Sequence, residues 1–169
     1  MLAGLPNLSN GFLQRDKRPV RRRIESSRVF ILHDANPQWL KVKHFIEERC
    51  GLETDDFGPA VDLAGDSLAS KIRDPLSRCG FAVCILGADI PHGLQRPQQR
   101  IVHQTGILHG TYGFGRVAIL IEDGCDIFTN ISGLIRMVFP KGNVEAKFVD
   151  LHRMLIRELH PNARSIGCV

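Results

Sequence analysis

The sequence predicts one α/β domain in which helices cover both faces of a central parallel sheet. Two observations carry this prediction. Apolar residues occupy consecutive positions at 29–32, 81–86 and 117–121, and amphipathic patterns of helical period separate these runs. A run without polar alternation indicates a strand that is buried on both faces. Such strands alternating with helices are typical of doubly wound folds, which bind ligands at the carboxyl ends of their strands.

The first strand leads into a helix with clear start and stop signals. Asn36 can cap this helix with Pro37 at its first position. Apolar residues then recur at helical spacing as far as Cys50, and Gly51 ends the helix. The pattern predicts a strand–loop–helix unit at the start of the domain.

The next elements are a strand, a loop and a second helix. A short strand is expected at 52–57, followed by a loop at 58–65 that is rich in Gly, Pro and Ala. The helix after this loop begins at Asp66 or Ser67. Pro75 lies inside it and should kink it or end it early, because proline removes a backbone donor and clashes with the preceding turn.

The remaining elements are a helix at 98–112, the third apolar strand, a weaker strand at 135–139 and a last helix from about 144 to 159. The glycines within 110–115 suggest a phosphate-binding loop, but such a loop joins a strand to the helix after it. Here the glycines join a helix to the next strand, so we interpret them as a helix C-cap and turn.

Composition excludes several classes of protein. With 169 residues, 43% hydrophobic and 24% charged, the chain has the composition of one soluble globular domain. No apolar run approaches the ~20 residues of a membrane-spanning helix, and no secretory signal begins the chain, so we expect a cytoplasmic protein. The five cysteines form no CxxC motif and the seven histidines no metal-binding spacing, so we expect no metal. Cys79 and Cys84 are interpreted as reduced core residues.

Residues 1–27 have the composition of a basic flexible tail or linker, with six Arg or Lys residues between positions 15 and 23. Such an arm can bind nucleic acid or an acidic surface. No interleaved aromatic residues or nucleic-acid motif accompany the charges, which favours a solvated tail. Direct nucleic-acid binding is therefore only a third hypothesis for the function, behind the two given below.

The polar residues, taken one by one, give weak functional signals. His33 follows the first strand, at the edge where doubly wound folds bind ligands. Asp66 or Ser67 opens a helix whose backbone N–H groups could hold a phosphate, although an ordinary helix cap is the simpler explanation. Gln104 shares a helix face with Arg100 by four-residue spacing, and nothing in the composition singles it out.

The second half of the chain resembles the predicted nucleotide-binding, TIR-like family of bacteria. The matching segments are QRIVHQTGILHG at 99–110, FGRVAILIEDG at 114–124, CDIFTNISGL at 125–134 and FPKGN at 139–143. The family typically carries an Asn-Val-Val-His-Glu-x-Gly-Leu-Phe-x-Gly pattern in the first segment and a strand ending in Glu-Glu-Gly-Cys in the second. The opening strand at 28–33 is similar to the family's Val-Phe-Ile-Val-His-Gly.

This resemblance implies a flavodoxin-like, three-layer TIR domain over residues 28–160, with 161–169 as a C-terminal tail. Domains of this family hydrolyse NAD⁺ at the nicotinamide–ribose bond or form a cyclic ADP-ribose product. In bacteria they often serve as antiphage defence effectors that an attached or partner module activates by assembling them. NAD⁺ is then the substrate, no metal takes part, and the expected partners are other copies of the domain or a sensor module.

Gln104 occupies the position of the family's catalytic glutamate. The resemblance keeps the family's histidine as His103, but Arg100 stands where the family usually has asparagine. In the family the carboxylate stabilises the positive charge that develops on the ribose, as in glycoside hydrolysis. Glutamine can still hydrogen-bond a ribose hydroxyl, but it cannot oppose that charge, and the loss of such a term typically costs ~10²–10³ in rate.

Two explanations for Gln104 are open. A deliberate Glu→Gln exchange would trap the substrate or prevent toxicity, and the otherwise well-kept flanking motif favours it. Alternatively, the domain is a natural, non-catalytic relative that binds a nucleotide or scaffolds a complex. The sequence therefore predicts an NAD⁺ glycohydrolase domain that Gln104 impairs, with a non-catalytic module as the alternative.

NAD⁺ is expected to lie across the carboxyl ends of the strands, beside Gln104. The loop at 58–65 corresponds to the loop through which TIR domains often contact their neighbours, so assembly could gate the site. The residues expected to contact NAD⁺ share a place at this edge or close to Gln104 in the helix: His33, Asp34, Asp66, Ser67, Asp89, Arg100 and His103.

Overall fold

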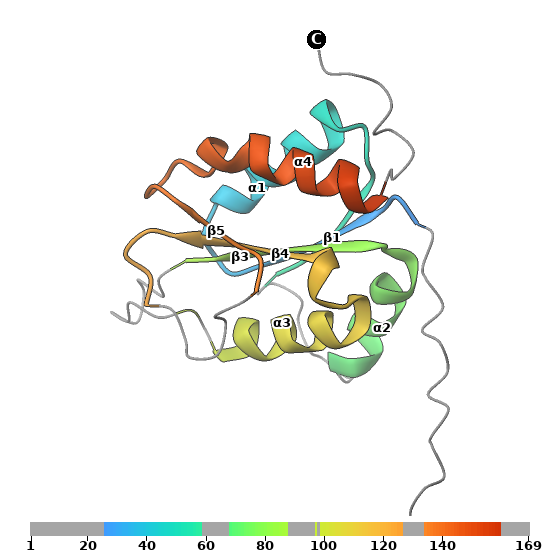
Figure 1. Ribbon diagram of the computed structural model, residues 1–169. Helices are drawn as coiled ribbons and strands as arrows, with labels where there is room; N and C mark the ends of the chain where they lie inside the picture. Colours follow the sequence, from blue (N-terminus) through green and yellow to red (C-terminus); the bar gives the residue numbers. More distant parts are fainter. Residues whose placement is uncertain (1–25, 59–67, 88–96, 98, 127–133, 160–169) are drawn as a thin grey trace, which may run out of the picture.

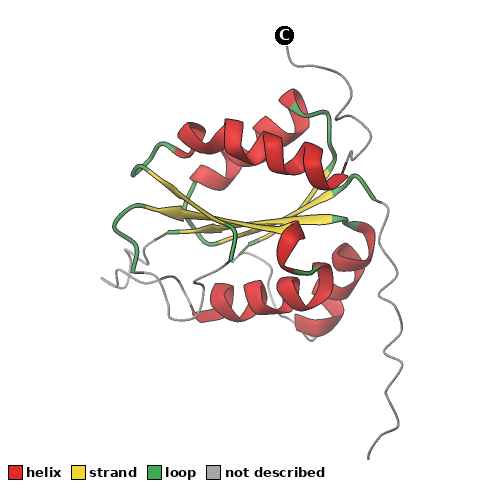
Figure 2. Cartoon of the chain, in the orientation of Figure 1, coloured by secondary structure: helices red, strands yellow, loops and turns green. Residues whose placement is uncertain are grey.

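The computed structural model describes residues 26–58, 68–87, 97, 99–126 and 134–159. Its described part has three layers, with one parallel sheet between two layers of helices (Figure 1). Figure 2 shows the sheet in yellow with red helices on both sides. The predicted α/β fold with a central parallel sheet is confirmed.

The sheet consists of five parallel strands in the order β2-β1-β3-β4-β5. In chain order the strands are β1 Val29–His33, β2 Thr54–Phe57, β3 Phe81–Leu86, β4 Val117–Glu122 and β5 Arg136–Phe139. The chain leaves β1 first to one side, toward β2, and then crosses to the other side, toward β3. This reversal makes the carboxyl ends of β1 and β3 a topological switch point, where open α/β sheets bind their ligands.

The helices fall into two groups that cover opposite faces of the sheet (Figure 1). In chain order they are α1 Gln38–His44, continued by the π-helical turn η1 Phe45–Arg49, then α2 Leu68–Arg78, α3 Gln99–Tyr112, the 3₁₀ turn η3 Phe114–Arg116, the 3₁₀ turn η4 Val144–Lys147 and α4 Phe148–Leu159. The helices α1 and α4 pack on one face of the sheet, whereas α2 and α3 pack on the other.

The three apolar runs form the centre of the sheet, as predicted. Every residue of β1, β3 and β4 is buried, because helices cover both faces of these strands. Neighbouring residues along β1 alternate between the two cores: Phe30 packs toward α2 and α3, and Ile31 packs toward α1 and α4. The core therefore fixes the register of the strands whose carboxyl ends carry the candidate site.

The structure corrects two predicted boundaries. The helix α2 does not end at Pro75 but continues to Arg78, since the buried side chains of Ile72 and Leu76 hold it against the sheet on both sides of the proline. The second strand begins at Thr54 and not at Leu52. The Leu52 N–H donates to the carbonyl of Ile46 in η1, so it is not free to join the sheet.

The glycine turn and the cysteines agree with the sequence interpretation. Gly113 has a φ of 83°, and its N–H donates to the His109 carbonyl at 3.0 Å, which is a helix C-terminal turn and not a phosphate-binding loop. Cys79 and Cys84 are reduced and buried, and burial raises the pKa of both thiols to about 12. The basic cluster of the predicted tail lies outside the described residues. No helix in the described ranges has the length and apolar character to span a membrane.

Candidate functional site

The loops after β1 and β3 are joined at the switch point by one buried carboxylate. Asp34 directly follows β1 and its residue surface is only 4% exposed. One of its carboxylate oxygens accepts a hydrogen bond from the Asn36 N–H at 2.7 Å, and the other accepts from the Gly87 N–H at 3.0 Å, directly after β3. Both oxygens are thus occupied by the backbone, so Asp34 positions the two loops.

His33 ends β1 in a tightly enclosed position. Its Nδ1 lies 2.7 Å from the Asp34 carbonyl, and since a carbonyl only accepts, this nitrogen carries the proton. The ring stacks on Trp39 with centroids 3.9 Å apart. Burial lowers the pKa of His33, which is therefore neutral at pH 7. A Cβ on Gly58 would lie 2.2 Å from the imidazole, so only glycine fits beside this ring.

Asn36 links the loop after β1 to the end of β4. Its side-chain oxygen accepts from the Gln38 N–H at 3.0 Å, as expected of a capping residue, but α1 begins at Gln38 and not at Pro37 as predicted. Its Nδ2 donates to Glu122 Oε2 at 3.1 Å, and Glu122 Oε1 accepts from the Gly142 N–H at 2.8 Å. Gly87 is again the only residue that fits, because a Cβ there would lie 2.6 Å from Asn36 Nδ2.

The first turns of α3 bring a guanidinium and a buried amide together beside this edge. Gln104 is fully buried, and its Oε1 accepts from Arg100 Nη1 at 3.3 Å. Two donors remain without partners: Arg100 Nη2 and Gln104 Nε2. Burial lowers the pKa of Arg100, and the charge of Asp34 partly compensates. The guanidinium in turn contributes to the lowered pKa of His33, so the three residues share one electrostatic environment.

The structure brings together four of the residues that the sequence singled out. His33 ends β1 and Asp34 directly follows it, and Arg100 and Gln104 lie on one face of α3, as their spacing predicts. The side chain of His103 is exposed, although it directly precedes the fully buried Gln104. Three further predicted contacts lie outside the described residues: Asp66, Ser67 and Asp89.

Sequence reasoning missed two residues of this edge and two glycines. Glu122 directly follows the predicted strand at 117–121 and was given no role, and Asn36 was predicted only to cap a helix. Gly58 lies in the predicted loop at 58–65 and Gly87 directly follows the predicted strand at 81–86; Gly58 allows the close approach of His33 and Gly87 that of Asn36. For Gly87, its place directly after a continuous apolar strand was a signal in the sequence that could have indicated such a close approach.

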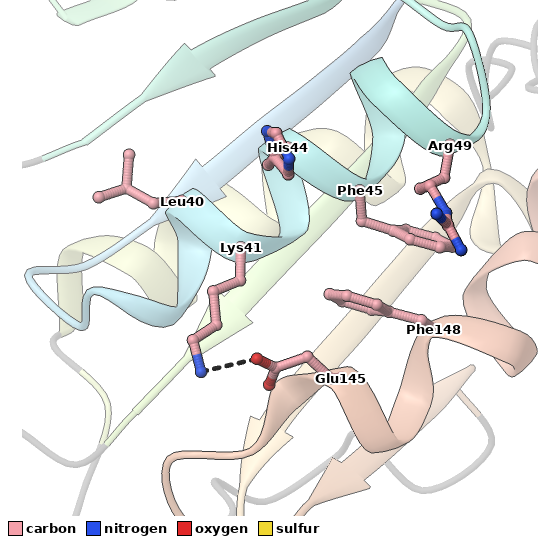
Figure 3. A pocket seen from close by; sticks show the side chains of 7 residues that line it. All are labelled: Leu40, Lys41, His44, Phe45, Arg49, Glu145 and Phe148. Atoms are coloured by element: carbon pink, nitrogen blue, oxygen red, sulfur yellow. Dashed lines mark ion pairs between the residues drawn. The ribbon is translucent and has the colours of Figure 1, made fainter.

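A separate groove of about 700 Å³ lies between α1–η1 and η4–α4, on the other helical layer (Figure 3). Phe45 and Phe148, which both line it, stack on each other with ring centroids 4.1 Å apart. Lys41 and Glu145 form an ion pair at 2.7 Å over its edge. This groove contains none of the residues that the sequence predicted to bind NAD⁺, so it is distinct from the carboxyl edge. Within the described ranges, no three His, Cys, Asp or Glu side chains are grouped as metal ligands.

Comparison with known proteins identifies the family. A family model described as the CAP12/Pycsar effector protein, TIR domain, matches residues 28–141. A search of curated proteins gives no significant match. The matched segment runs from the start of β1 to the residues after β5 and includes His33, Asp34, Arg100 and Gln104. Fold, sheet order and family model agree, and the chain belongs to the TIR-domain family of CAP12/Pycsar effector proteins.

Proposed function

We propose that this TIR domain binds NAD⁺ at the carboxyl ends of β1 and β3 and belongs to the NAD⁺-cleaving kind. Gln104, at the position of the catalytic glutamate, leaves the chain with little turnover. Family membership and the burial of Gln104 beside the switch point support this proposal. The reaction is hydrolysis of the nicotinamide–ribose bond, which consumes water and releases nicotinamide, ADP-ribose and a proton.

The hydrogen-bond balance at position 104 carries the proposal. Arg100 Nη2 and Gln104 Nε2 are both donors, both are buried, and neither has an acceptor. A carboxylate of the same shape would accept from both guanidinium nitrogens, and charge-assisted pairs of this kind are the stronger hydrogen bonds. The surroundings of this residue therefore suit a glutamate better than a glutamine, which favours the view that Gln104 replaces one.

The chemistry accounts for the loss of turnover. Departure of nicotinamide builds positive charge on the ribose, and a nearby carboxylate lowers the energy of that state. An amide of the same shape offers only a partial dipole. We expect the exchange to lower kcat by about 10²–10³-fold while the nucleotide still binds.

The test is the Gln104→Glu variant. Release of nicotinamide from NAD⁺ should rise about 10²–10³-fold over the original chain when both are measured at the same high protein concentration. Gln104→Ala serves as the matched control, because it also removes the amide but supplies no carboxylate. An activity of Gln104→Glu no greater than that of Gln104→Ala, with both variants folded, would rule out the proposed role of position 104.

A non-catalytic nucleotide-binding or scaffolding module is the alternative, and Arg100 is the observation that favours it. A guanidinium four residues before position 104 would pair with a carboxylate there and neutralise part of its charge. The double variant Arg100→Asn with Gln104→Glu matches the family pattern at both positions. If neither this variant nor Gln104→Glu releases nicotinamide, the chain is a binding module.

We further propose that assembly activates the domain, either by self-association or through a partner sensor module. Activity of the Gln104→Glu variant per mole of protein should then rise steeply with protein concentration. A constant specific activity over a hundredfold dilution would contradict activation by self-association and leave a sensor partner as the activator. The cytoplasmic location stays a prediction, and fractionation of cells that express the full chain would test it.

A further inference from the structure

The groove between α1–η1 and η4–α4 presents apolar side chains to solvent on the helical layer that the candidate site does not use. Leu40 is 54% exposed in it, and the stacked rings of Phe45 and Phe148 are half-buried. A groove of about 700 Å³ that combines apolar and aromatic side chains with a few polar groups has the composition of a binding site. The polar groups come from four residues of its lining: Lys41, His44, Arg49 and Glu145.

The two walls of the groove are joined by direct contacts, so its shape is formed without an occupant. The Phe45 and Phe148 rings stack across the two walls, and the Lys41–Glu145 ion pair joins α1 to η4 (Figure 3). The Lys41 ammonium also donates to the Gly142 carbonyl at 3.3 Å. A preformed groove loses little binding free energy to the ordering of its own side chains.

One wall of the groove contains a rare backbone conformation. The turn η1 is π-helical, and the Cys50 N–H donates to the Phe45 carbonyl, five residues back, at 3.2 Å. Turns of this kind are uncommon and occur frequently at functional sites. Phe45 begins the turn and Arg49 ends it, and both line the groove. The place of the turn therefore indicates a function for this surface independently of the shape of the groove.

The unpaired charge of the groove is positive. Among the described residues that line it, Glu145 is the only acidic one, and Lys41 pairs with it at 2.7 Å. Arg49 is exposed and has no ion-pair partner within the described ranges. An occupant that carries both apolar groups and negative charge is therefore complementary to the groove.

We propose that this groove is the docking site for an acidic, amphipathic segment of a partner protein. The segment places apolar side chains against Leu40 and the phenylalanine pair, and a carboxylate on Arg49. Amphipathic helices dock into apolar grooves in this way, with anchors at three- and four-residue spacing. The inference goes beyond the proposed function, because it concerns the helical layer opposite α3 and requires neither binding nor cleavage of NAD⁺.

Two occupants that the chain itself could supply are less complementary. The basic tail has six Arg or Lys residues between positions 15 and 23, so its charge has the same sign as that of Arg49. A second copy that presented the same groove in a two-fold contact would bring two Arg49 side chains to one interface. Like charges that face each other across an interface weaken association.

The probe is a synthetic amphipathic helix of about four turns, with leucines at three- and four-residue spacing and glutamates between them. Its binding to the full chain is measured by fluorescence anisotropy, and a peptide with lysines in place of the glutamates is the control. The acidic peptide should bind at least about tenfold more tightly, and its binding should weaken as salt is raised. Absent binding, or equal binding of the two peptides, would overturn the proposal.

A charge reversal tests the role of Arg49. Arg49→Glu should weaken binding of the acidic peptide at least about tenfold and strengthen binding of the lysine peptide, because it reverses the unpaired charge of the groove. Arg73→Glu is the matched control, since Arg73 is exposed on α2 in the opposite layer and changes the net charge equally. Equal effects of the two substitutions would show a non-specific attraction and overturn the proposal.

A polar substitution tests the apolar contact. Leu40→Asn should weaken binding of the acidic peptide by about five- to tenfold, because the partner no longer covers an exposed leucine. Val149→Asn is the control, because Val149 is 63% exposed on α4 but does not line the groove. Binding that Leu40→Asn leaves unchanged would place the peptide elsewhere and contradict the proposed docking.

Sedimentation of the full chain without peptide tests whether a second copy occupies the groove. We expect Leu40→Asn and Arg49→Glu to leave the mass distribution of the chain as it is in the original. Self-association that both substitutions abolish would make the groove an interface between copies and overturn docking of a partner segment. All of these measurements use chains with Gln104, so absent turnover in Gln104→Glu would count only against the proposed function.

Discussion

Arginines stand at both ends of the parallel sheet, and the two ends use them differently. At the amino end, Arg28 pairs with Glu53 and with Asp55, and Arg78 reaches the same Asp55 at 3.5 Å. Arg116, just before β4, lies 3.9 Å from a carboxylate oxygen of Glu158. Here guanidinium groups meet carboxylates that the chain itself supplies.

At the carboxyl end, Arg100 meets an amide and keeps one buried nitrogen without an acceptor. The carboxylates of this end, Asp34 and Glu122, are occupied by N–H groups of the loops and of Asn36. At the amino end the arginines are thus paired with carboxylates of the chain, whereas at the carboxyl end the carboxylates hold the loops and two buried donors of α3 have no acceptor. Four predictions sharpen or break this comparison.

The largest effect is expected from Asp34→Ala. The substitution leaves the N–H groups of Asn36 and Gly87 without acceptors, and hydrogen bonds to charged groups each contribute about 1.5–3 kcal/mol. We expect the free energy of unfolding to fall by about 3 kcal/mol or more, measured by urea denaturation, with nucleotide binding lost as the loops separate. A loss below about 1 kcal/mol would show that Asp34 does not hold this edge.

The glycine that faces His33 should be the next most sensitive position. In Gly58→Ala the new Cβ would lie 2.2 Å from an imidazole that is already stacked on Trp39, and overpacking of this kind costs about 1–3 kcal/mol. Gly106→Ala is the control, because nothing lies within 4 Å of its Cβ. Since Gly106 is inside α3, alanine there should stabilise the domain by about 0.5–1 kcal/mol.

The buried histidine gives the carboxyl end a dependence on pH. Burial lowers the pKa of His33 below the ordinary 6.5, so the unfolded chain takes up a proton that the native chain does not. The contribution of neutral His33 to the free energy of unfolding is therefore fully present above pH 6.5. It is lost as the pH falls from 6.5 toward the lower pKa that His33 has in the native chain. The slope of the free energy of unfolding against pH cannot exceed about 1.4 kcal/mol per pH unit for one proton.

Urea denaturation between about pH 5 and 8 measures this slope. His33→Gln should flatten this slope. His109 contributes in the same direction, because burial also lowers its pKa, so part of the slope should remain in His33→Gln. A slope that His33→Gln does not alter would refute the contribution of His33.

The smallest effect is expected at the amino end. Glu53 is exposed, and its ion pair with Arg28 is screened by solvent, so Glu53→Gln should change the free energy of unfolding by less than about 1 kcal/mol. The same measurement on Asp34→Asn tests the comparison directly, because each substitution removes one negative charge. If Glu53→Gln and Asp34→Asn lowered the free energy of unfolding equally, the two ends of the sheet would not differ as described above.

Much of the fold could be predicted from local pattern. Continuous apolar runs indicate β1, β3 and β4 because a strand covered on both faces excludes polar side chains from either face. Helical spacing places Arg100 and Gln104 on one face of α3, where the structure joins them. The helix α2 continues past Pro75, and the second strand begins after Leu52, because tertiary contacts overrode a local preference in both places.

The sequence by itself determined the layers, the central strands and the side of α3 that carries Arg100 and Gln104, because these depend on the periodicity of apolar residues. Only the tertiary structure decided which residues at the carboxyl ends of the strands hydrogen-bond to one another. The contacts of Asp34 with Gly87 and of Asn36 with Glu122 span 53 and 86 residues. No local pattern encodes such pairs, since they arise from the order in which the strands meet in the sheet. The same tertiary arrangement buries Gln104 and leaves two donors on α3 without acceptors.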